Sequence, residues 1–230
     1  MISNSQGIKK FAVIVAGGNG SRMKLSCPKQ FLEINGLPVL MHTINAFFSY
    51  VPDVDLIIVL PEKEVYRWRE LCNKFNYNIK HKIVSGGGTR FHSVKNGLAQ
   101  ISGEGIVFIH DGVRPLVSKN TINHCYQTAV QKGNALPVIK PSESLRQVSG
   151  NKNRAADRNS YYLVQTPQTF RVSLIKKAYN QPYNKKFTDD ASVLESTGEN
   201  IYLVEGNREN IKITYPEDIL LVETFMSHTK

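Results

Sequence analysis

The chain has 230 residues, of which 41% are hydrophobic and 21% charged, and these values fit one globular α/β domain with a sizeable core. No apolar run reaches the length that crosses a bilayer, and residues 1–10 lack the apolar core of a signal peptide, so we expect a cytoplasmic protein with no membrane partner. The formal net charge of +10 attracts anions, but the positive residues are scattered and do not identify which anion binds.

Short apolar runs alternate along the chain with stretches of helical periodicity. Near-continuous apolar runs are typical of strands buried on both faces, as in a parallel sheet. The strands predicted in this way are residues 11–16, 56–60, 82–85, 105–110, 135–139, 201–204 and 211–214. Helices are predicted over residues 65–75 and 94–101, after a cap at Ser118, over 188–195, and from Pro216 onward. The alternation predicts a single Rossmann-like α/β domain over residues 1–230, with a doubly wound, mostly parallel sheet.

The first predicted strand runs directly into a glycine-rich loop, Ala16-Gly17-Gly18-Asn19-Gly20-Ser21-Arg22-Met23, which Pro28-Lys29-Gln30 follows. Glycines let backbone N–H groups approach a phosphate chain, and Arg22 and Lys29 add positive charge. The spacing matches neither the GxGxxG fingerprint nor the P-loop. The combination therefore predicts a triphosphate site of another kind.

The pair GGxGxRM and PKQ resembles the nucleotide-binding loop of sugar-phosphate nucleotidyltransferases. Its PKQ form resembles the methylerythritol phosphate cytidylyltransferases and the related ribitol phosphate cytidylyltransferases, and further matches run from residue 11 to residue 223. The resemblance implies transfer of CMP from CTP to 2-C-methyl-D-erythritol 4-phosphate, a sugar-alcohol phosphate, in non-mevalonate isoprenoid precursor synthesis. It implies Mg²⁺ bound with CTP, and leaves the protein ligands of the metal open. It also implies nucleotide contacts from Ala16, Gly17, Gly18 and Gly20.

In that reaction an oxygen of the sugar phosphate attacks the α-phosphorus of CTP. Two anions must approach each other, so the protein works by positioning and electrostatic stabilisation and needs no covalent nucleophile. The resemblance implies that Arg22 and Lys29 stabilise the charge on the α-phosphate. It also implies that Lys212 and Arg158 hold the incoming phosphate.

The glycine turn Gly86-Gly87-Gly88-Thr89-Arg90 lies at a strand end and opens a helix. It resembles the family's GGxxRxxSV segment, which implies cytosine recognition by Gly87, Arg90 and Ser93. Gly88 stands where some relatives carry an acidic residue, so base contacts at that position would come from the backbone.

The segment His110-Asp111-Gly112-Val113-Arg114-Pro115 ends another predicted strand, where ligands of open α/β sheets bind. Asp111 could hold magnesium directly or through water, bind a substrate hydroxyl, or pair with Arg114 as a turn residue. The family pattern HDAARP implies contacts of Asp111 with nucleotide and substrate, and of Arg114 with substrate. Gly112 replaces the first alanine, which removes a methyl but no chemistry.

Residues 140–162 form a polar stretch without helical period, and loops of this length are usually functional or disordered. Ser144 and Arg158 resemble residues at the two ends of the family's protruding β-arm. That resemblance implies a homodimer with arm exchange, in which these two residues contact the phosphate bound by the partner. Thr166, in Gln165-Thr166-Pro167-Gln168, is implied to face the same phosphate.

Polar and apolar residues alternate over Asn210-Ile211-Lys212-Ile213-Thr214, which predicts a strand with Asn210, Lys212 and Thr214 on one face. Lys212 is either a surface lysine or points into the site. The family's NIKxTxPEDL pattern favours the second interpretation.

Three other functions stay open. A ribitol 5-phosphate cytidylyltransferase shares most motifs, although residues 188–195 and Asp157-Arg158 look more like the methylerythritol enzyme. A basic nucleic-acid-binding protein would fit the charge, but no nucleic-acid module is recognisable, and we expect no such partner. A catalytically idle dimeric scaffold would be expected to have lost Arg22, Lys29 or Lys212, and all are present.

Overall fold

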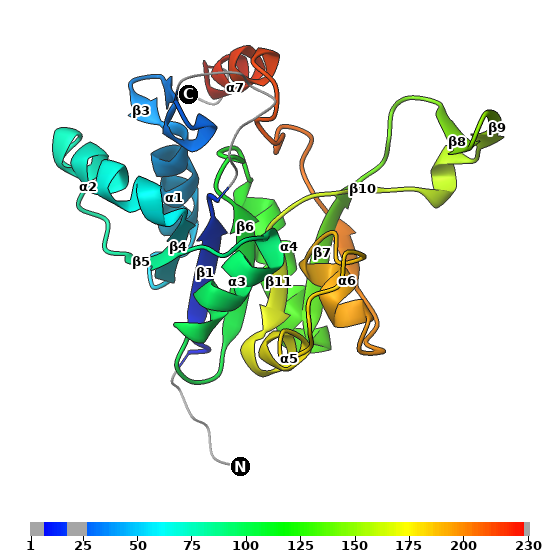
Figure 1. Ribbon diagram of the computed structural model, residues 1–230, viewed down its shortest axis with the longest axis horizontal. Helices are drawn as coiled ribbons and strands as arrows, with labels where there is room; N and C mark the ends of the chain where they lie inside the picture. The colour runs from blue at the N-terminus through cyan, green and yellow to red at the C-terminus, as the bar shows by residue number, and fades with distance from the viewer. Residues whose placement is uncertain (1–6, 18–26, 228–230) are drawn as a thin grey trace.

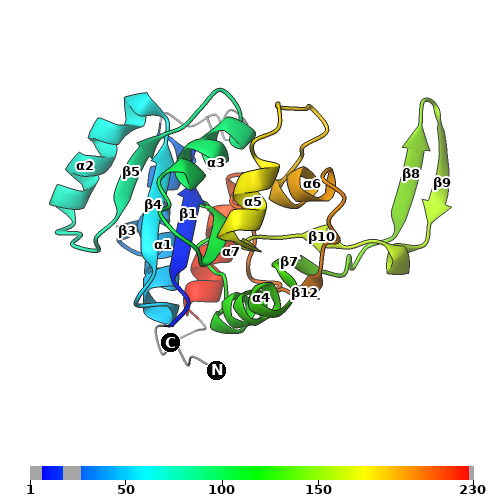
Figure 2. The same cartoon turned by 90° about the horizontal axis from the view of Figure 1, so that it is seen from below.

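A mostly parallel sheet of eight strands forms the centre of the molecule, between two layers of helices (Figures 1 and 2). The computed structural model describes residues 7–17 and 27–227. The strand order is β10-β7-β11-β6-β1-β4-β5, with β12 also paired to β7. The strands of this sheet are β1 Lys10–Val15, β4 Asp55–Leu60, β5 Lys82–Ser85, β6 Ile106–Asp111, β7 Asn134–Ile139, β10 Leu163–Val164, β11 Gln168–Arg171 and β12 Leu203–Glu205.

Strand directions follow the doubly wound pattern on one side of the sheet and depart from it on the other. β1 pairs parallel with both β4 and β6, and β4 pairs parallel with β5. β11 pairs antiparallel with β6 and β7, while β12 is parallel to β7. The predicted α/β fold is therefore confirmed, and the strands predicted between residues 11 and 204 are present with shifted ends.

Alternate residues of each central strand pack on opposite faces of the sheet. Ala12 and Ile14 face one helical layer, whereas Phe11 and Val13 face the other. The first layer contains α1 Val39–Tyr50, α2 Val65–Lys74 and α4 Lys119–Lys132, and the second contains α3 Arg90–Ala99, α5 Val172–Ala178 and α6 Asp190–Glu195. The last helix, α7 Glu217–Ser227, buries Val222 near the small hairpin β2 Glu33–Ile34 and β3 Leu37–Pro38.

The caps explain where several helices begin. Ser118 accepts a hydrogen bond from Thr121 N at 3.1 Å and caps α4, as its position in the sequence predicts. Asp189 caps α6 by accepting from Ser192 N at 2.8 Å. The periodicity analysis did not predict α1 and α5.

A two-stranded hairpin projects from the domain, as Figures 1 and 2 show. Its strands are β8 Leu145–Ser149 and β9 Lys152–Ala156, paired antiparallel from Leu145 opposite Ala156 to Ser149 opposite Lys152. We call residues 140–162 the arm. The protruding β-arm expected as part of the fold is therefore present.

One predicted strand is wrong. Residues 211–214 have no strand structure, and their backbone bonds run from Ile211 N to Glu209 O at 2.7 Å and from Ile213 N to Val113 O at 3.0 Å. The alternation comes from another cause, because Ile213 is buried beside Val113 whereas Lys212 is exposed. Asn210 shares no exposed face with Lys212, since it is fully buried and donates to Thr166 O at 2.8 Å.

Candidate active site

A cavity of about 530 Å³ opens where β1, β4, β5 and β6 end. Its wall includes Val15 and Ala16 after β1, Pro61 after β4, the glycine turn 86–88 after β5, and Asp111 at the end of β6. Ligands of open α/β sheets bind beyond the carboxyl ends of the strands, and sites for small molecules measure roughly 300–1,000 Å³. This cavity therefore has the position and size of a nucleotide site.

The beginning of the glycine-rich loop and the Pro-Lys-Gln turn lie together on one wall. Ala16, Gly17 and Lys29 line the cavity, while Gly18, Gly20 and Arg22 lie outside the described residues. Gln30 Nε2 donates to Ala16 O at 2.9 Å and so ties this turn to the end of β1. No role was predicted for Gln30 from the sequence, although Gln30 is part of the Pro-Lys-Gln motif that predicted the site.

Lys29 is a buried cation of this wall, with 8% of its surface exposed. It belongs to a 3₁₀ turn, Lys29–Phe31, and its Nζ donates to Ile213 O at 2.9 Å. An ammonium held in place at the wall of a cavity can stabilise the negative charge of a ligand without rearrangement of the protein.

The opposite wall is the glycine turn before α3. Gly87, Arg90 and Ser93 line the cavity, and the cytosine contacts implied for them stay a prediction. Gly87 N donates to Ser93 Oγ at 3.1 Å, and that hydroxyl lies 3.0 Å from Thr89 O. Thr89 caps α3 by accepting from His92 N. Ser93 therefore fixes the shape of the glycine turn in addition to any contact with a base.

The guanidinium of Arg90 is held by a buried carboxylate of α6. Its two terminal nitrogens donate to Asp190 Oδ1 and Oδ2, each at 2.7 Å, and Tyr179 OH donates to Asp190 Oδ1 at 2.6 Å. Burial alone would lower the pKa of Arg90, but Asp190 and then Asp111 outweigh it and raise the pKa above its ordinary value. Neither Asp190 nor Tyr179 was predicted from the sequence to have a role.

Asp111 lies among several cations at the floor of the cavity. Its carboxylate is 3.0 Å from Lys212 Nζ, 3.3 Å from Arg114 Nε and 3.7 Å from Arg90 Nε. Burial opposes its ionisation, yet the charges of Arg90, Lys212 and Arg114 together hold the pKa of Asp111 well below its ordinary value. Asp111 is therefore an anion at neutral pH.

An irregular segment, not a strand, brings Lys212 to Asp111. Arg114 Nη1 donates to Asn210 O at 2.7 Å, and Lys29 Nζ donates to Ile213 O at 2.9 Å. These bonds lie on either side of Lys212 in the sequence. The expected location of Lys212 in the site is therefore observed with a different local structure.

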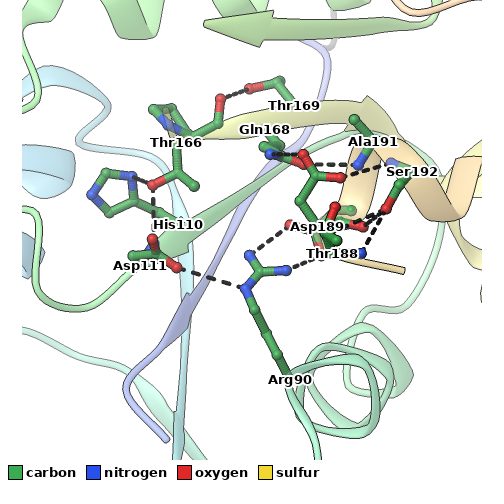
Figure 3. Close-up of polar contacts among 12 residues, drawn as sticks. Arg90, His110, Asp111, Thr166, Gln168, Thr169, Thr188, Asp189, Ala191 and Ser192 are labelled. Atoms are coloured by element: carbon green, nitrogen blue, oxygen red, sulfur yellow. Dashed lines mark hydrogen bonds and ion pairs between the residues drawn. The ribbon is translucent and has the colours of Figure 1, made fainter. Parts of the chain in front are cut away.

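Thr166 lies behind Asp111 and is 5% exposed. Its Oγ1 accepts from Asp111 N at 3.1 Å and is 2.9 Å from His110 Nδ1 (Figure 3). His110 Nε2 is 3.0 Å from Arg114 O. Burial, assisted by the charges of Arg114 and Arg90, lowers the pKa of His110 to about 4, although the hydrogen bond to Arg114 O and the charge of Asp111 oppose this shift. His110 belongs to the motif that predicted Asp111 and Arg114, but no function was predicted for His110 itself.

Ser144 and Arg158 lie in the arm, and neither is among the described residues that line the cavity. Both are exposed, and Arg158 Nη1 donates to Ser142 O at 2.9 Å. One chain thus brings Lys29, Arg90, Asp111, Arg114 and Lys212 together and leaves the two arm residues apart from them.

Comparison with known proteins places the chain in a family. The model of the IspD family, described as 2-C-methyl-D-erythritol 4-phosphate cytidylyltransferase, matches residues 10–228. A protein of that name from Bacteroides fragilis is 51% identical over 215 residues, which are 94% of this chain and 98% of that protein. Another from Phocaeicola vulgatus is 48% identical over 219 residues, 95% of this chain and 100% of that protein.

The solved structures agree. The crystal structure of 4-diphosphocytidyl-2C-methyl-D-erythritol synthase from Anaerococcus prevotii superposes with a TM-score of 0.80 at 26% identity, covering 96% of both chains. The 2-C-methyl-D-erythritol 4-phosphate cytidylyltransferase from Thermus thermophilus superposes with a TM-score of 0.73 at 26% identity, covering 96% of this chain and 98% of that one. In the described part of this chain, no helix is long and apolar enough to cross a membrane. The chain belongs to the 2-C-methyl-D-erythritol 4-phosphate cytidylyltransferase family.

Proposed function

We propose that this protein transfers the CMP group of CTP to 2-C-methyl-D-erythritol 4-phosphate, giving 4-diphosphocytidyl-2-C-methyl-D-erythritol and pyrophosphate. The observation that carries the proposal is the ring of cations around Asp111 in the cavity at the strand ends, in a chain that the family model matches over residues 10–228. A surface of this kind fits two phosphorylated substrates that meet there.

In the proposed reaction a phosphate oxygen of the acceptor forms a bond to the α-phosphorus of CTP. The bond from that phosphorus to the oxygen bridging the α- and β-phosphates breaks, and pyrophosphate leaves with the electron pair. Both reactants are anions, so the cavity acts by positioning and charge stabilisation. Lys29, with Arg22, would stabilise the α-phosphate, and Lys212 would hold the incoming phosphate beside Asp111.

Magnesium is the proposed cofactor with CTP. Within the described residues no group of three or more His, Cys, Asp or Glu side chains forms a metal cage. Mg²⁺ in nucleotide sites is commonly held by one or two carboxylates and substrate phosphates, and the ionised Asp111 in the cavity fits that arrangement. When bound, the ion would neutralise triphosphate charge and assist departure of pyrophosphate.

We further propose a homodimer in which the arm of each subunit completes the partner's site. The arm projects from the domain (Figure 1), and its Ser144 and Arg158 are exposed and do not line the cavity of their own chain. A hairpin of two strands is marginally stable alone, so a partner surface would also stabilise it. A cytoplasmic location remains part of this proposal.

The test is pyrophosphate release from CTP and Mg²⁺, with 2-C-methyl-D-erythritol 4-phosphate and ribitol 5-phosphate assayed side by side. Release with the first acceptor alone is the expected result. Release with ribitol 5-phosphate alone would keep the chemistry and overturn the acceptor. Salt-sensitive binding of random oligonucleotides, with no turnover of either acceptor, would favour a nucleic-acid-binding function instead.

A further inference from the structure

His110 is a fully buried histidine directly beside Asp111, and both of its ring nitrogens have partners. Nε2 is 3.0 Å from the backbone carbonyl of Arg114, and Nδ1 is 2.9 Å from Thr166 Oγ1. Its ring also meets the ring of Phe47 edge-on, at 4.9 Å between centroids. These contacts leave the imidazole little freedom to turn.

The partners determine which nitrogen carries the proton. A carbonyl oxygen only accepts, so the nitrogen beside Arg114 O must be the donor. Thr166 Oγ1 already accepts from Asp111 N, and its own proton has His110 Nδ1, 2.9 Å away, as its acceptor, so Nδ1 carries no proton and the ring is neutral with one N–H. His110 is therefore the Nε2–H tautomer, and its Nδ1 accepts from the hydroxyl of Thr166.

The hydroxyl of Thr166 then has a fixed direction as well. Its proton points at His110, and a lone pair of Oγ1 accepts from Asp111 N at 3.1 Å. The paired register of β11 with β6 ends at Gln168 opposite Ile109, so the hydroxyl takes a backbone donor just beyond that pairing. His110 thus reaches Asp111 through Thr166 and reaches Arg114 directly.

We propose that His110 is a positioning residue for the reaction proposed above: a neutral imidazole of fixed tautomer that holds Thr166 against Asp111 and holds the carbonyl of Arg114. The ring links the backbones of Asp111 and Arg114 through Thr166, in addition to the direct bond from Arg114 N to Asp111 O at 3.1 Å. While its proton is donated to His110, the hydroxyl of Thr166 has no proton to donate to another acceptor. A hydrogen bond from Thr166 to a phosphate would require the hydroxyl to leave His110.

The tautomer can be measured without any assay of activity. Nitrogen-15 NMR of the wild-type protein, which has 6 histidines, would identify His110 by the signal lost in His110→Gln. We expect the neutral Nε2–H pattern at pH 7, because Nε2 donates to Arg114 O while Nδ1 accepts from Thr166. A cationic ring at pH 7, or an Nδ1–H tautomer, would overturn the proposal.

Two matched substitutions separate the two bonds of the ring. The amide oxygen of His110→Asn can replace Nδ1 and still accept from Thr166, whereas the amide nitrogen of His110→Gln can replace Nε2 and still donate to Arg114 O. We expect kcat to fall about tenfold or more in each variant, with unchanged affinity for CTP in calorimetry. Wild-type kcat in both folded variants would contradict a positioning role.

Substitutions at Thr166 provide a second test. Thr166→Val should lower kcat, and Thr166→Ser should restore most of the loss because it keeps the hydroxyl. The double variant Thr166→Val with His110→Gln should be no worse than Thr166→Val alone, since the two residues act in one chain. Additive losses would show that His110 does not act through Thr166. A wild-type protein inactive on both acceptors would refute the proposed function, while the NMR result would still decide the state of His110.

Discussion

The Asp111 centre and the arm are opposite kinds of structure in one chain. The carboxylate of Asp111 is 10% exposed, and charged side chains from α3, the turn after β6 and the segment before α7 lie 3.0–3.7 Å from it. In the arm, polar side chains bond across the hairpin at the surface, as Arg154 Nε does to Gln147 Oε1 at 2.9 Å, and Val148 is 70% exposed. The first region is preorganised by its own chain. The second presents groups whose partners would have to come from elsewhere.

The difference teaches where function can be examined in a single subunit. A buried charge cluster keeps its geometry because each group is paired, and removal of one member leaves others unpaired. An exposed hairpin contributes little to the stability of its own domain, so changes there should affect acceptor use much more than folding.

The largest effect is expected at Lys29 in the buried region. Lys29→Ala should lower kcat by about a hundredfold or more and change CTP affinity much less, because the charge is needed most in the transition state. Pyrophosphate release gives kcat, and calorimetry gives the affinity. Lys185→Ala, at an exposed lysine that does not line the cavity, is the matched control. A Lys29 variant that lost only CTP affinity would contradict this role.

The next effect concerns the arm and tests whether it acts in the partner's site. Arg158→Ala should be nearly inactive with the acceptor, yet it should unfold at the wild-type temperature, since Arg158 is exposed. Equal amounts of Lys29→Ala and Arg158→Ala subunits, unfolded and refolded together, should regain about a quarter of wild-type activity. Half of the dimers are then mixed, and each mixed dimer has one intact site.

Two results would separate the alternatives for the arm. No recovery in the mixture, from dimers shown by sedimentation to have exchanged subunits, would mean that the arm serves its own chain. A monomer with full activity would remove the dimer from the mechanism altogether.

A smaller effect is expected behind the cavity, at Asp190. Asp190→Asn leaves Arg90 without its bidentate partner, which should destabilise the fold by about 3 kcal/mol. Tyr179→Phe removes one hydrogen bond to the same carboxylate and should cost about 1 kcal/mol. Chemical denaturation measures both changes. Equal costs for the two variants would show that the Arg90 pair adds nothing beyond an ordinary hydrogen bond.

The sequence predicted most of the sheet because the central strands are buried on both faces and appear as short apolar runs. It predicted the cavity wall because glycine turns and charged motifs follow those strands directly. It did not predict the pair Arg90 and Asp190, since nothing local links residues that are 100 positions apart. The strand predicted over 211–214 was wrong because the alternation of polar and apolar residues there has another cause. The segment buries Ile213, whose backbone is bonded to Val113 and Lys29.

His110 shows the same limit at close range. It stood in a quoted motif, but its function depends on Thr166, which lies 56 positions away in the sequence. A side chain of this type is recognised only when both of its ring nitrogens have partners in three dimensions. Charged residues that face a cavity are thus easier to predict from motifs than the neutral residues that hold them.

The smallest predicted effect concerns Gly112, where the family pattern has alanine. A Cβ at this position would lie 2.9 Å from Ala16 Cβ and 3.1 Å from Leu40 Cδ1, so the methyl that seemed dispensable has no free space here. Gly112→Ala should cost about 1 kcal/mol, lower the melting temperature by roughly 2–4 °C and weaken CTP binding, because Ala16 begins the nucleotide loop. Ala16→Gly in the same protein should recover much of both losses, since it removes the crowding partner and the two changes are coupled. If Gly112→Ala alone left stability and CTP affinity unchanged, the end of β1 would be more adaptable than the tightly paired Asp111 centre beside it. The contrast between a preorganised cavity and an exposed arm would then be weaker.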